Sequence, residues 1–259
     1  NNDGGDGGVF NMNSTISPQV DIQSSSENSN NLDSNINDMS QRFSSINITN
    51  QQNIETLFSS IKTNNNLNSN NFDIKQIIKW TSNNPCTKTN RRNKDELQRE
   101  EKEWGNQMIG QINNGQWTTK LGEELVYHII KILYNDNPRK PSKINGFLPD
   151  WETDNCIYEV KTSNWWVSGT AGEKVLGTFI KYQDIPALYG KPLKIVCIAN
   201  QEYEFKYGKT KYFGENISTK TKQILDLAKS WNIEYVTFSD LILELNAKYN
   251  TDFSILTQI

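Results

Sequence analysis

The seven residues Leu193–Ala199 (LKIVCIA) form an almost continuous apolar run. A run of this length that does not alternate between apolar and polar residues is typical of a strand buried on both faces. Such a strand needs helices on both sides of its sheet to cover it. The run therefore predicts an α/β fold.

Helical and extended patterns alternate around this run, as an α/β sandwich with a mixed sheet requires. Thr118 and Ser239 are expected to cap two of the helices, and Thr170 with Glu173 has the spacing of a capping box at the start of another. The expected helices are 93–112, 118–134, 169–185, 218–233 and 239–249, and the expected strands are 148–153, 157–162, 193–199 and 234–238.

The first 75 residues differ in composition from the rest of the chain. They contain 18 Asn and 13 Ser and show no sustained apolar period. A segment of this kind cannot bury enough apolar surface to offset the entropy lost on ordering. Only residues 46–61 and 72–80 show weak helical patterns. The sequence therefore predicts a disordered Asn/Ser-rich tail (1–75), a helical N-terminal extension (76–116) and a main domain (117–259).

Net charge divides in the same way. The tail carries eight acidic and three basic side chains, a net charge of −5 against −3 for the whole chain, so residues 76–259 carry about +2. A domain this close to neutral neither requires nor excludes a nucleic-acid partner.

The three cysteines, Cys86, Cys156 and Cys197, are far apart and odd in number. They show neither a disulfide framework nor the spacing of a zinc site, so a reducing intracellular compartment, cytoplasm or nucleus, is the simpler expectation. No apolar run reaches membrane-spanning length, and no membrane partner is expected.

Three charged residues lie in and beside the expected strand pair, in the stretch LPDWETDNCIYEVKTSN. Side chains at i and i+2 of a strand share a face, so Glu159 and Lys161 are neighbours. The turn at residues 154–155 can fold Asp150 back beside Glu159. Charges on a buried strand are costly unless they are compensated. The alternative is a solvated strand face, where an exposed ion pair contributes only ~0–1 kcal/mol.

Two carboxylates and an ammonium that converge in this way can hold a hard divalent cation. Mg²⁺ (or Mn²⁺) binds carboxylate oxygens and keeps several waters, so Asp150 and Glu159 would suffice, helped by the Val160 backbone carbonyl. Such an ion polarises a phosphodiester oxygen and lowers the pKa of a bound water. Lys161 would orient that water or neutralise the charge that builds up on the phosphoryl group.

The same residues resemble the motif of the PD-(D/E)xK nuclease superfamily, the fold of type II restriction endonucleases and many repair nucleases. The match consists of Pro149-Asp150, eight further residues and Glu159-Val160-Lys161, within a similarity that runs roughly from residue 117 to residue 201. The resemblance implies a restriction-endonuclease-like mixed β-sheet flanked by helices with an α-β-β-β-α-β core, Mg²⁺ dependence and hydrolysis of DNA. Residues 143–147 would have to supply the first strand of that core.

The segment LGEELV resembles the first-helix motif of this superfamily, in which a Glu completes the metal site. The resemblance implies this role for Glu123, with Glu124 as the close competitor. The alternative for either residue is a favourable contact between a carboxylate and the dipole of the first helical turn.

Further candidates lie downstream. Lys174 and Lys181 share one face of the expected helix 169–185, either as a solvated face or as contacts to DNA phosphates. Trp165 could stack on a base or belong to the core. Gln201, just after the apolar strand, could hydrogen-bond the attacking water or start a turn.

The sequence thus predicts a Mg²⁺-dependent endonuclease that hydrolyses DNA phosphodiester bonds, with Asp150, Glu159, Lys161 and Glu123 as its catalytic residues. The resemblance implies products with 5′-phosphates. Three alternatives stay open: a catalytically inactive nucleic-acid-binding module of the same fold, a structure-specific repair or junction nuclease, and a globular interaction domain with no nucleic-acid role. A homodimer is a further expectation, because symmetric cutting of both strands needs two active sites.

Overall fold

The computed structural model describes residues 52, 56, 72–85, 93–112, 115–135, 137–166, 175, 177–209 and 211–249. All of them belong to one unit, residues 46–259. The predicted disordered tail lies outside the described residues except for residues 52, 56 and 72–75.

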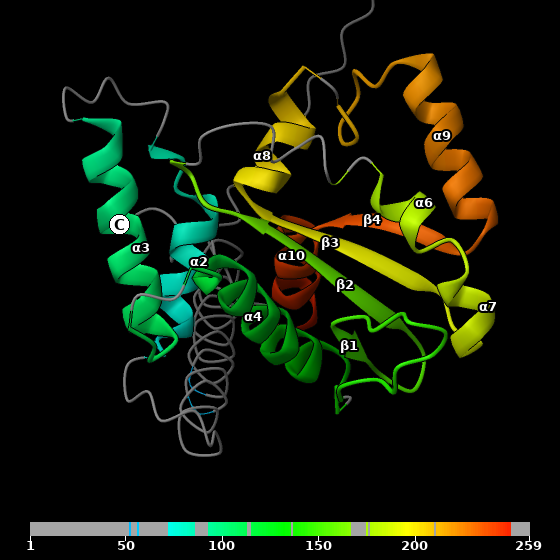
Figure 1. The fold of residues 1–259 in the computed structure, drawn as a ribbon, viewed down its shortest axis with the longest axis horizontal. Coiled ribbons are helices and arrows are strands. Elements are labelled where there is room, and N and C mark those ends of the chain that lie inside the picture. Colours follow the sequence, from blue (N-terminus) through cyan, green and yellow to red (C-terminus); the bar gives the residue numbers. More distant parts are fainter. Residues whose placement is uncertain are drawn as a thin grey trace, which may run out of the picture. The chain divides into compact units, whose positions relative to one another are not determined.

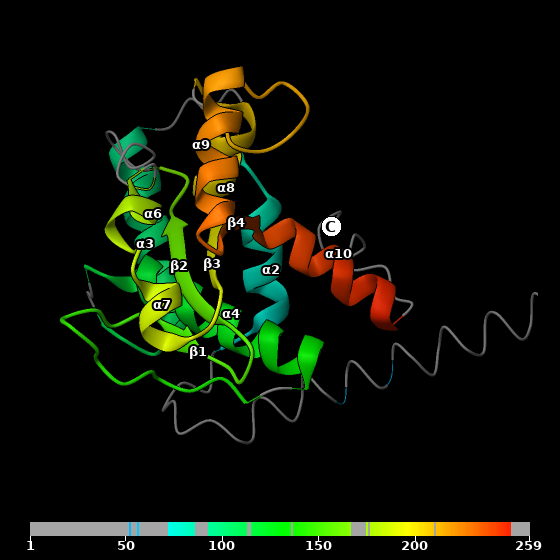
Figure 2. The same ribbon diagram turned by 90° about the vertical axis from the view of Figure 1, so that its right-hand side faces the viewer.

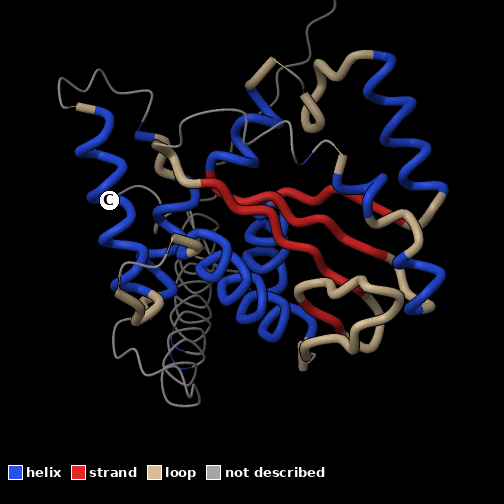
Figure 3. Tube along the Cα trace, in the orientation of Figure 1, coloured by secondary structure: helices blue, strands red, loops and turns tan. Residues whose placement is uncertain are grey.

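A four-stranded mixed sheet in the order β1-β2-β3-β4 forms the centre of the fold (Figures 1 and 3). β1 (Trp151–Glu152) pairs antiparallel with β2 (Ile157–Ser163). β3 (Leu193–Ala199) is parallel to β2, and β4 (Ile233–Thr237) is parallel to β3. The predicted α/β class with a mixed sheet is therefore confirmed.

Helices cover both faces of this sheet, and Figure 2 shows α2 and α10 on one side of the strands and α6 and α7 on the other. The first face is covered by α2 (Ile74–Ser82), the end of α3 (Lys94–Met108), α4 (Trp117–Tyr134) and α10 (Phe238–Tyr249). The second is covered by α6 (Thr178–Lys181), α7 (Ile185–Tyr189), Phe205 of α8 (Asn200–Tyr207) and α9 (Thr219–Ser230).

Strand β3 is buried on both sides, as its apolar run predicts. Val196 and Ile198 belong to the apolar cluster on the α4 side of the sheet, whereas Ile195 and Cys197 belong to the cluster on the α9 side. All four side chains have no exposed surface. The alternation of a strand therefore connects the two clusters through one element.

The apolar core of the sheet domain includes residues that lie before the predicted starts of both the helical extension (76) and the main domain (117). Phe72 and Ile74 are buried in the same cluster as α4, and α2 contacts β3. The Asp73 side chain caps α2 by accepting hydrogen bonds from the N–H groups of Lys75 and Gln76. The helical pattern at 72–80 is confirmed, and α2 belongs to the core of the sheet domain.

Two predicted helix caps are wrong. α4 begins at Trp117, so Thr118 lies inside the helix, and its N-cap Gln116 makes no side-chain capping bond. α10 begins at Phe238, where Thr237 Oγ1 accepts the Asp240 N–H at 3.0 Å. In both cases the helix begins at a buried aromatic residue, Trp117 or Phe238. The residue expected to be the cap, Thr118 or Ser239, is therefore the second residue of the helix.

The single helix predicted for residues 169–185 is also wrong in its described part. α6 ends at Lys181, and a separate helix, α7, begins at Ile185 with Pro186 in its first turn. Proline has no N–H to continue the preceding helix and disfavours helical geometry in the residue before it. The predicted capping box, Thr170 with Glu173, lies outside the described residues.

Residues 143–147 do not supply a strand. Ile144 and Phe147 pair only with each other across a tight turn, through two hydrogen bonds of 3.1 and 2.8 Å. Arg139 instead pairs with Glu152 on the outer side of β1. Among the described residues, two strands rather than three lie between α4 and α6, so the expected α-β-β-β-α-β order is not what the chain forms there.

Candidate metal and phosphate site

The β1–β2 hairpin brings Asp150 beside Glu159, as predicted. Its register pairs Trp151 with Tyr158, which places Asp150 opposite Glu159. The Asp150 N–H donates to the Tyr158 carbonyl at 3.1 Å. Asp150 Oδ2 accepts a hydrogen bond from the Val160 N–H at 2.6 Å, so the carboxylate is anchored to the backbone of β2.

Glu159 and Lys161 lie on one face of β2 and form an ion pair, with 2.5 Å between Glu159 Oε1 and Lys161 Nζ. The Glu159 side chain is only 4 % exposed, which rules out the solvated strand face. Its second oxygen, Oε2, is buried and has no hydrogen-bond partner among the described residues. An unpartnered charged oxygen is costly to bury, so this atom is where a cation would be accommodated.

The electrostatics of the pair also favour a cation. Burial, and next the nearby Glu159 carboxylate, raise the pKa of Asp150 to about 7. The Val160 N–H and Lys161 act in the opposite direction without cancelling this effect. Two carboxylates in a desolvated site repel each other, and a divalent ion between them would relieve that repulsion.

Helix α4 brings Glu123 to the edge of this site. Gly122 packs so closely on β2 that a Cβ there would overlap the Thr162 side chain. The Glu123 carbonyl accepts a hydrogen bond from the Trp151 indole N–H at 2.9 Å, and Glu123 Oε2 lies 2.8 Å from Lys140 Nζ. Both Glu123 and Glu124 lie beyond the first helical turn, so a contact with the helix dipole does not explain them.

Glu124 is half-buried, and its environment differs from that of Glu123. Burial is the largest effect on its carboxyl group and raises its pKa, while Lys140 lowers it and Glu123 raises it further. Only Glu123 forms an ion pair within the described part of the chain. Glu123 is the better candidate of the two, because its charge raises the pKa of Asp150.

The donor set fits a hard divalent ion with two protein carboxylates. No three or more Asp, Glu, His or Cys side chains gather closely enough to hold a metal within the described ranges. Mg²⁺ commonly binds through one or two carboxylates and keeps several waters, so Asp150 and Glu159 meet its needs. The Val160 N–H is engaged by Asp150, and a ligand role for the Val160 carbonyl stays a prediction.

The sequence pattern did not reveal Tyr182, which lies beside this site. Its ring centroid is 5.9 Å from Lys161 Nζ and 4.7 Å from Lys181 Nζ. Burial raises the pKa of its hydroxyl most, and the Glu159 carboxylate raises that pKa further through its charge and through a hydrogen bond. Tyr182 is the C-cap residue at which α6 ends, so the helical periodicity expected over 169–185 gave no signal for it.

Of the three candidate DNA-binding residues, one is exposed, one is buried in the core and one lies outside the described residues. Lys181 is exposed at the end of α6, and Lys174 lies outside the described residues. Trp165 is 5 % exposed, and its indole N–H donates to the Trp80 carbonyl at 2.9 Å. Base stacking by Trp165 is therefore not supported, because its ring is packed in the core.

Glu101 of α3, a residue with no motif to mark it, secures the chain after β2. Its buried carboxylate accepts hydrogen bonds from the backbone N–H groups of Trp165 (2.9 Å) and Trp166 (3.2 Å) and from the Trp80 indole (2.9 Å). One side chain thus ties α2 and α3 to the segment that leaves β2.

Gln201 lies in the first turn of α8, directly after the end of β3. It is 2 % exposed, and its Nε2 has no hydrogen-bond partner among the described residues. Ala199, before it, has a φ of 56°, a region that a residue with a Cβ rarely adopts. α8 contacts both β2 and β3, but a contact of Gln201 with an attacking water stays a prediction.

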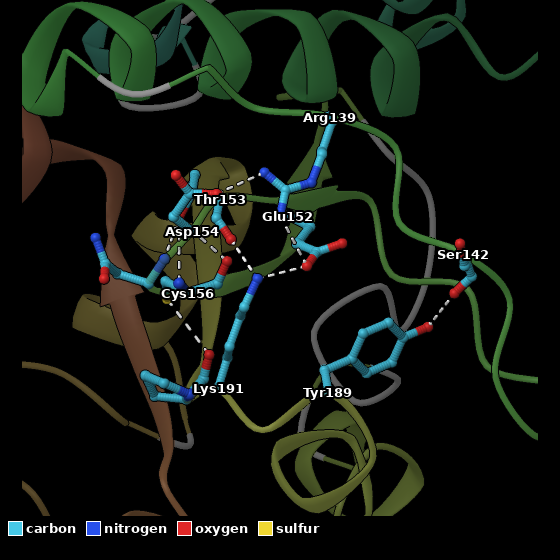
Figure 4. Close-up of polar contacts among 10 residues, drawn as sticks. Arg139, Ser142, Glu152, Thr153, Asp154, Cys156, Tyr189 and Lys191 are labelled. Carbon is cyan, nitrogen blue, oxygen red and sulfur yellow. Dashed lines mark hydrogen bonds and ion pairs between the residues drawn. The ribbon is translucent and has the colours of Figure 1, made fainter.

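An ionic network outside the motif braces the hairpin that carries Asp150 (Figure 4). Glu152 Oε1 contacts Arg139 at 3.1 Å and Lys191 at 2.5 Å, and Arg139 also contacts Asp154 at 2.8 Å. Lys191 donates a second hydrogen bond to the Thr153 carbonyl at 2.7 Å. The network ties the hairpin to the loop before it and to the segment that enters β3.

No known family model, curated protein or solved structure matches this chain. The PD-(D/E)xK resemblance thus depends on the motif residues themselves. In the part of the chain that the structure describes, no helix has the length and apolar character needed to cross a membrane.

Proposed function

We propose that this protein is a metal-dependent endonuclease of the PD-(D/E)xK type that hydrolyses DNA phosphodiester bonds. One observation carries the proposal. Buried Glu159 pairs with Lys161 through one carboxylate oxygen and leaves the other without a hydrogen-bond partner in the described structure, directly opposite Asp150.

Each residue of the site has a distinct task. Asp150 and Glu159 would hold Mg²⁺ or Mn²⁺, and Glu123 of α4 would support the ion from the edge of the site. The bound ion would polarise a phosphodiester oxygen and make hydroxide available near neutral pH. Lys161, 27 % exposed, would face the substrate and neutralise negative charge that develops on the phosphoryl group.

The proposal is tested by Mg²⁺-dependent cleavage of duplex DNA. Asp150→Asn and Lys161→Met should each reduce cleavage by about two orders of magnitude or more, the usual effect of removing a charged group that acts in the transition state. Asp226→Asn and Lys229→Met on exposed positions of α9 are matched controls that should cleave like the wild type. Wild-type cleavage by either site variant, with folding confirmed by circular dichroism, would remove the assignment.

One observation favours a second candidate, a nucleic-acid-binding module of the same fold without catalysis. Within the described residues no set of three acidic side chains is assembled, and Glu123 is paired with Lys140. This candidate predicts DNA binding at low salt, where phosphate contacts are strongest, and no cleavage in either Mg²⁺ or Mn²⁺.

Plain duplex, flap and four-way junction substrates in the same cleavage assay would distinguish a structure-specific nuclease from one that cuts plain duplex DNA.

A further inference from the structure

Lys140 and Glu123 form an ion pair at the edge of the candidate metal site. Lys140 Nζ lies 2.8 Å from Glu123 Oε2 and 3.9 Å from the centroid of the Trp151 ring. The same Trp151 ring donates its N–H to the Glu123 carbonyl. Lys140 is therefore held in place by the residue that directly follows Asp150.

Glu123 is close enough to the carboxylate pair to matter for metal binding. Its negative charge raises the pKa of Asp150. Its carboxylate nevertheless pairs with Lys140, and within the described residues no three carboxylates are assembled. The Lys140 ammonium is therefore bound to the carboxylate that would otherwise be free to support the metal ion as a third acidic group.

We propose that Lys140 is an exchangeable counter-ion of Glu123: it neutralises this carboxylate until a divalent ion binds and then yields the carboxylate to that ion. This inference rests on the proposed function, because it assumes a metal at Asp150 and Glu159. The pair is suited to exchange because the Lys140 side chain is 55 % exposed and the Glu123 side chain 21 % exposed. Ion pairs exposed to this degree are weak and open readily.

The direction in which the Mn²⁺ affinity changes in Lys140→Met distinguishes an exchangeable counter-ion from a purely structural role of Lys140. Lys140→Met removes the charge and keeps an apolar chain that can pack on Trp151. If Lys140 competes with the metal, this variant should bind Mn²⁺ about two- to five-fold more tightly, the range expected for the loss of a weak ion pair. If Lys140 only supports the structure, the variant should bind Mn²⁺ more weakly.

The experiment measures Mn²⁺ affinity by electron paramagnetic resonance or calorimetry, without DNA. Lys143→Met is the matched control, since Lys143 is an exposed lysine of the same loop and no ion pair of it is found in the described structure. A general effect of charge would appear in both variants. In a Glu123→Gln background, Lys140→Met should leave Mn²⁺ affinity unchanged, because the competed carboxylate is gone.

The outcomes distinguish the two proposals. If Asp150→Asn binds Mn²⁺ like the wild type, the proposed metal site is wrong and the exchange falls with it. If Asp150→Asn abolishes binding while Lys140→Met matches Lys143→Met, or tightens binding equally with and without Glu123, only the exchange is wrong.

Discussion

Replacing Gly122 with alanine tests whether α4 is packed directly on the strand that carries Glu159 and Lys161. An added Cβ would lie 1.8 Å from Thr162 Oγ1 and 2.8 Å from Thr162 Cβ. Rotation of the Thr162 side chain would move Oγ1 away, but Thr162 Cβ would stay where it is. The backbone of α4 or β2 therefore has to shift.

Two opposing effects determine the magnitude. Alanine favours a helix over glycine by about 1 kcal/mol. Overpacking that displaces the backbone costs about 1–3 kcal/mol, and the residual Cβ–Cβ distance of 2.8 Å argues for the upper part of that range. We expect Gly122→Ala to lower the free energy of unfolding by about 1–2 kcal/mol.

Urea denaturation followed by circular dichroism measures this difference as a lower midpoint with an unchanged slope. Gly115→Ala is the control, since a Cβ there meets no atom of the described residues within 4 Å, and it should change stability by less than about 0.5 kcal/mol. Thr162→Ala should relieve part of the overlap, so the double variant should be more stable than the two single effects predict. A Gly122→Ala protein as stable as the wild type would refute the close packing of α4 on β2.

Two further predictions concern stability. The pKa of Asp150 is raised to about 7, so between its unfolded value near 3.8 and pH 7 the folded protein keeps a proton that the unfolded chain has lost. Stability from this group should fall as pH rises through that window without added metal, and urea midpoints at pH 5 and pH 8 should show a smaller fall in Asp150→Asn. Glu101→Gln should cost about 2 kcal/mol in the same assay, because an amide group cannot accept all three N–H bonds that the carboxylate accepts. An unaltered midpoint would show that the Glu101 contacts contribute little.

The parts of the fold that follow from local pattern were predictable. The apolar run Leu193–Ala199 forms β3, and its two buried faces explain why it does not alternate. Glu159 and Lys161 share a face because the side-chain period of a strand leaves no other arrangement. The helix expected over 218–233 forms as α9, and the Ser218 side chain caps it by accepting the Thr221 N–H.

The parts that depend on tertiary contacts were not predictable from one sequence. Glu101 bonds to residues more than 60 positions away, and nothing in the local pattern of α3 marks it. Tyr182 is the C-cap of α6, where the chain breaks before α7, and an unbroken helix over 169–185 gave no reason to single it out. Lys140 lies in a loop rich in Pro, Asn and Lys that carries no motif, and its pairing with Glu123 depends on where α4 packs against the hairpin.

The length of β1 shows why a motif alone does not define such a site. β1 has two residues, too few for ladder hydrogen bonds alone to hold it against β2. Its position depends on Glu152, which contacts Arg139 on one side and Lys191 on the other. Asp150 is therefore aligned with Glu159 in two ways: by its own hydrogen bonds to the backbone of β2, and by ion pairs that involve none of the motif residues. A chain that kept the motif but lost Glu152 would hold Asp150 by its hydrogen bonds to β2 alone, so we expect Glu152→Gln to bind Mn²⁺ more weakly than the wild type while it keeps the fold.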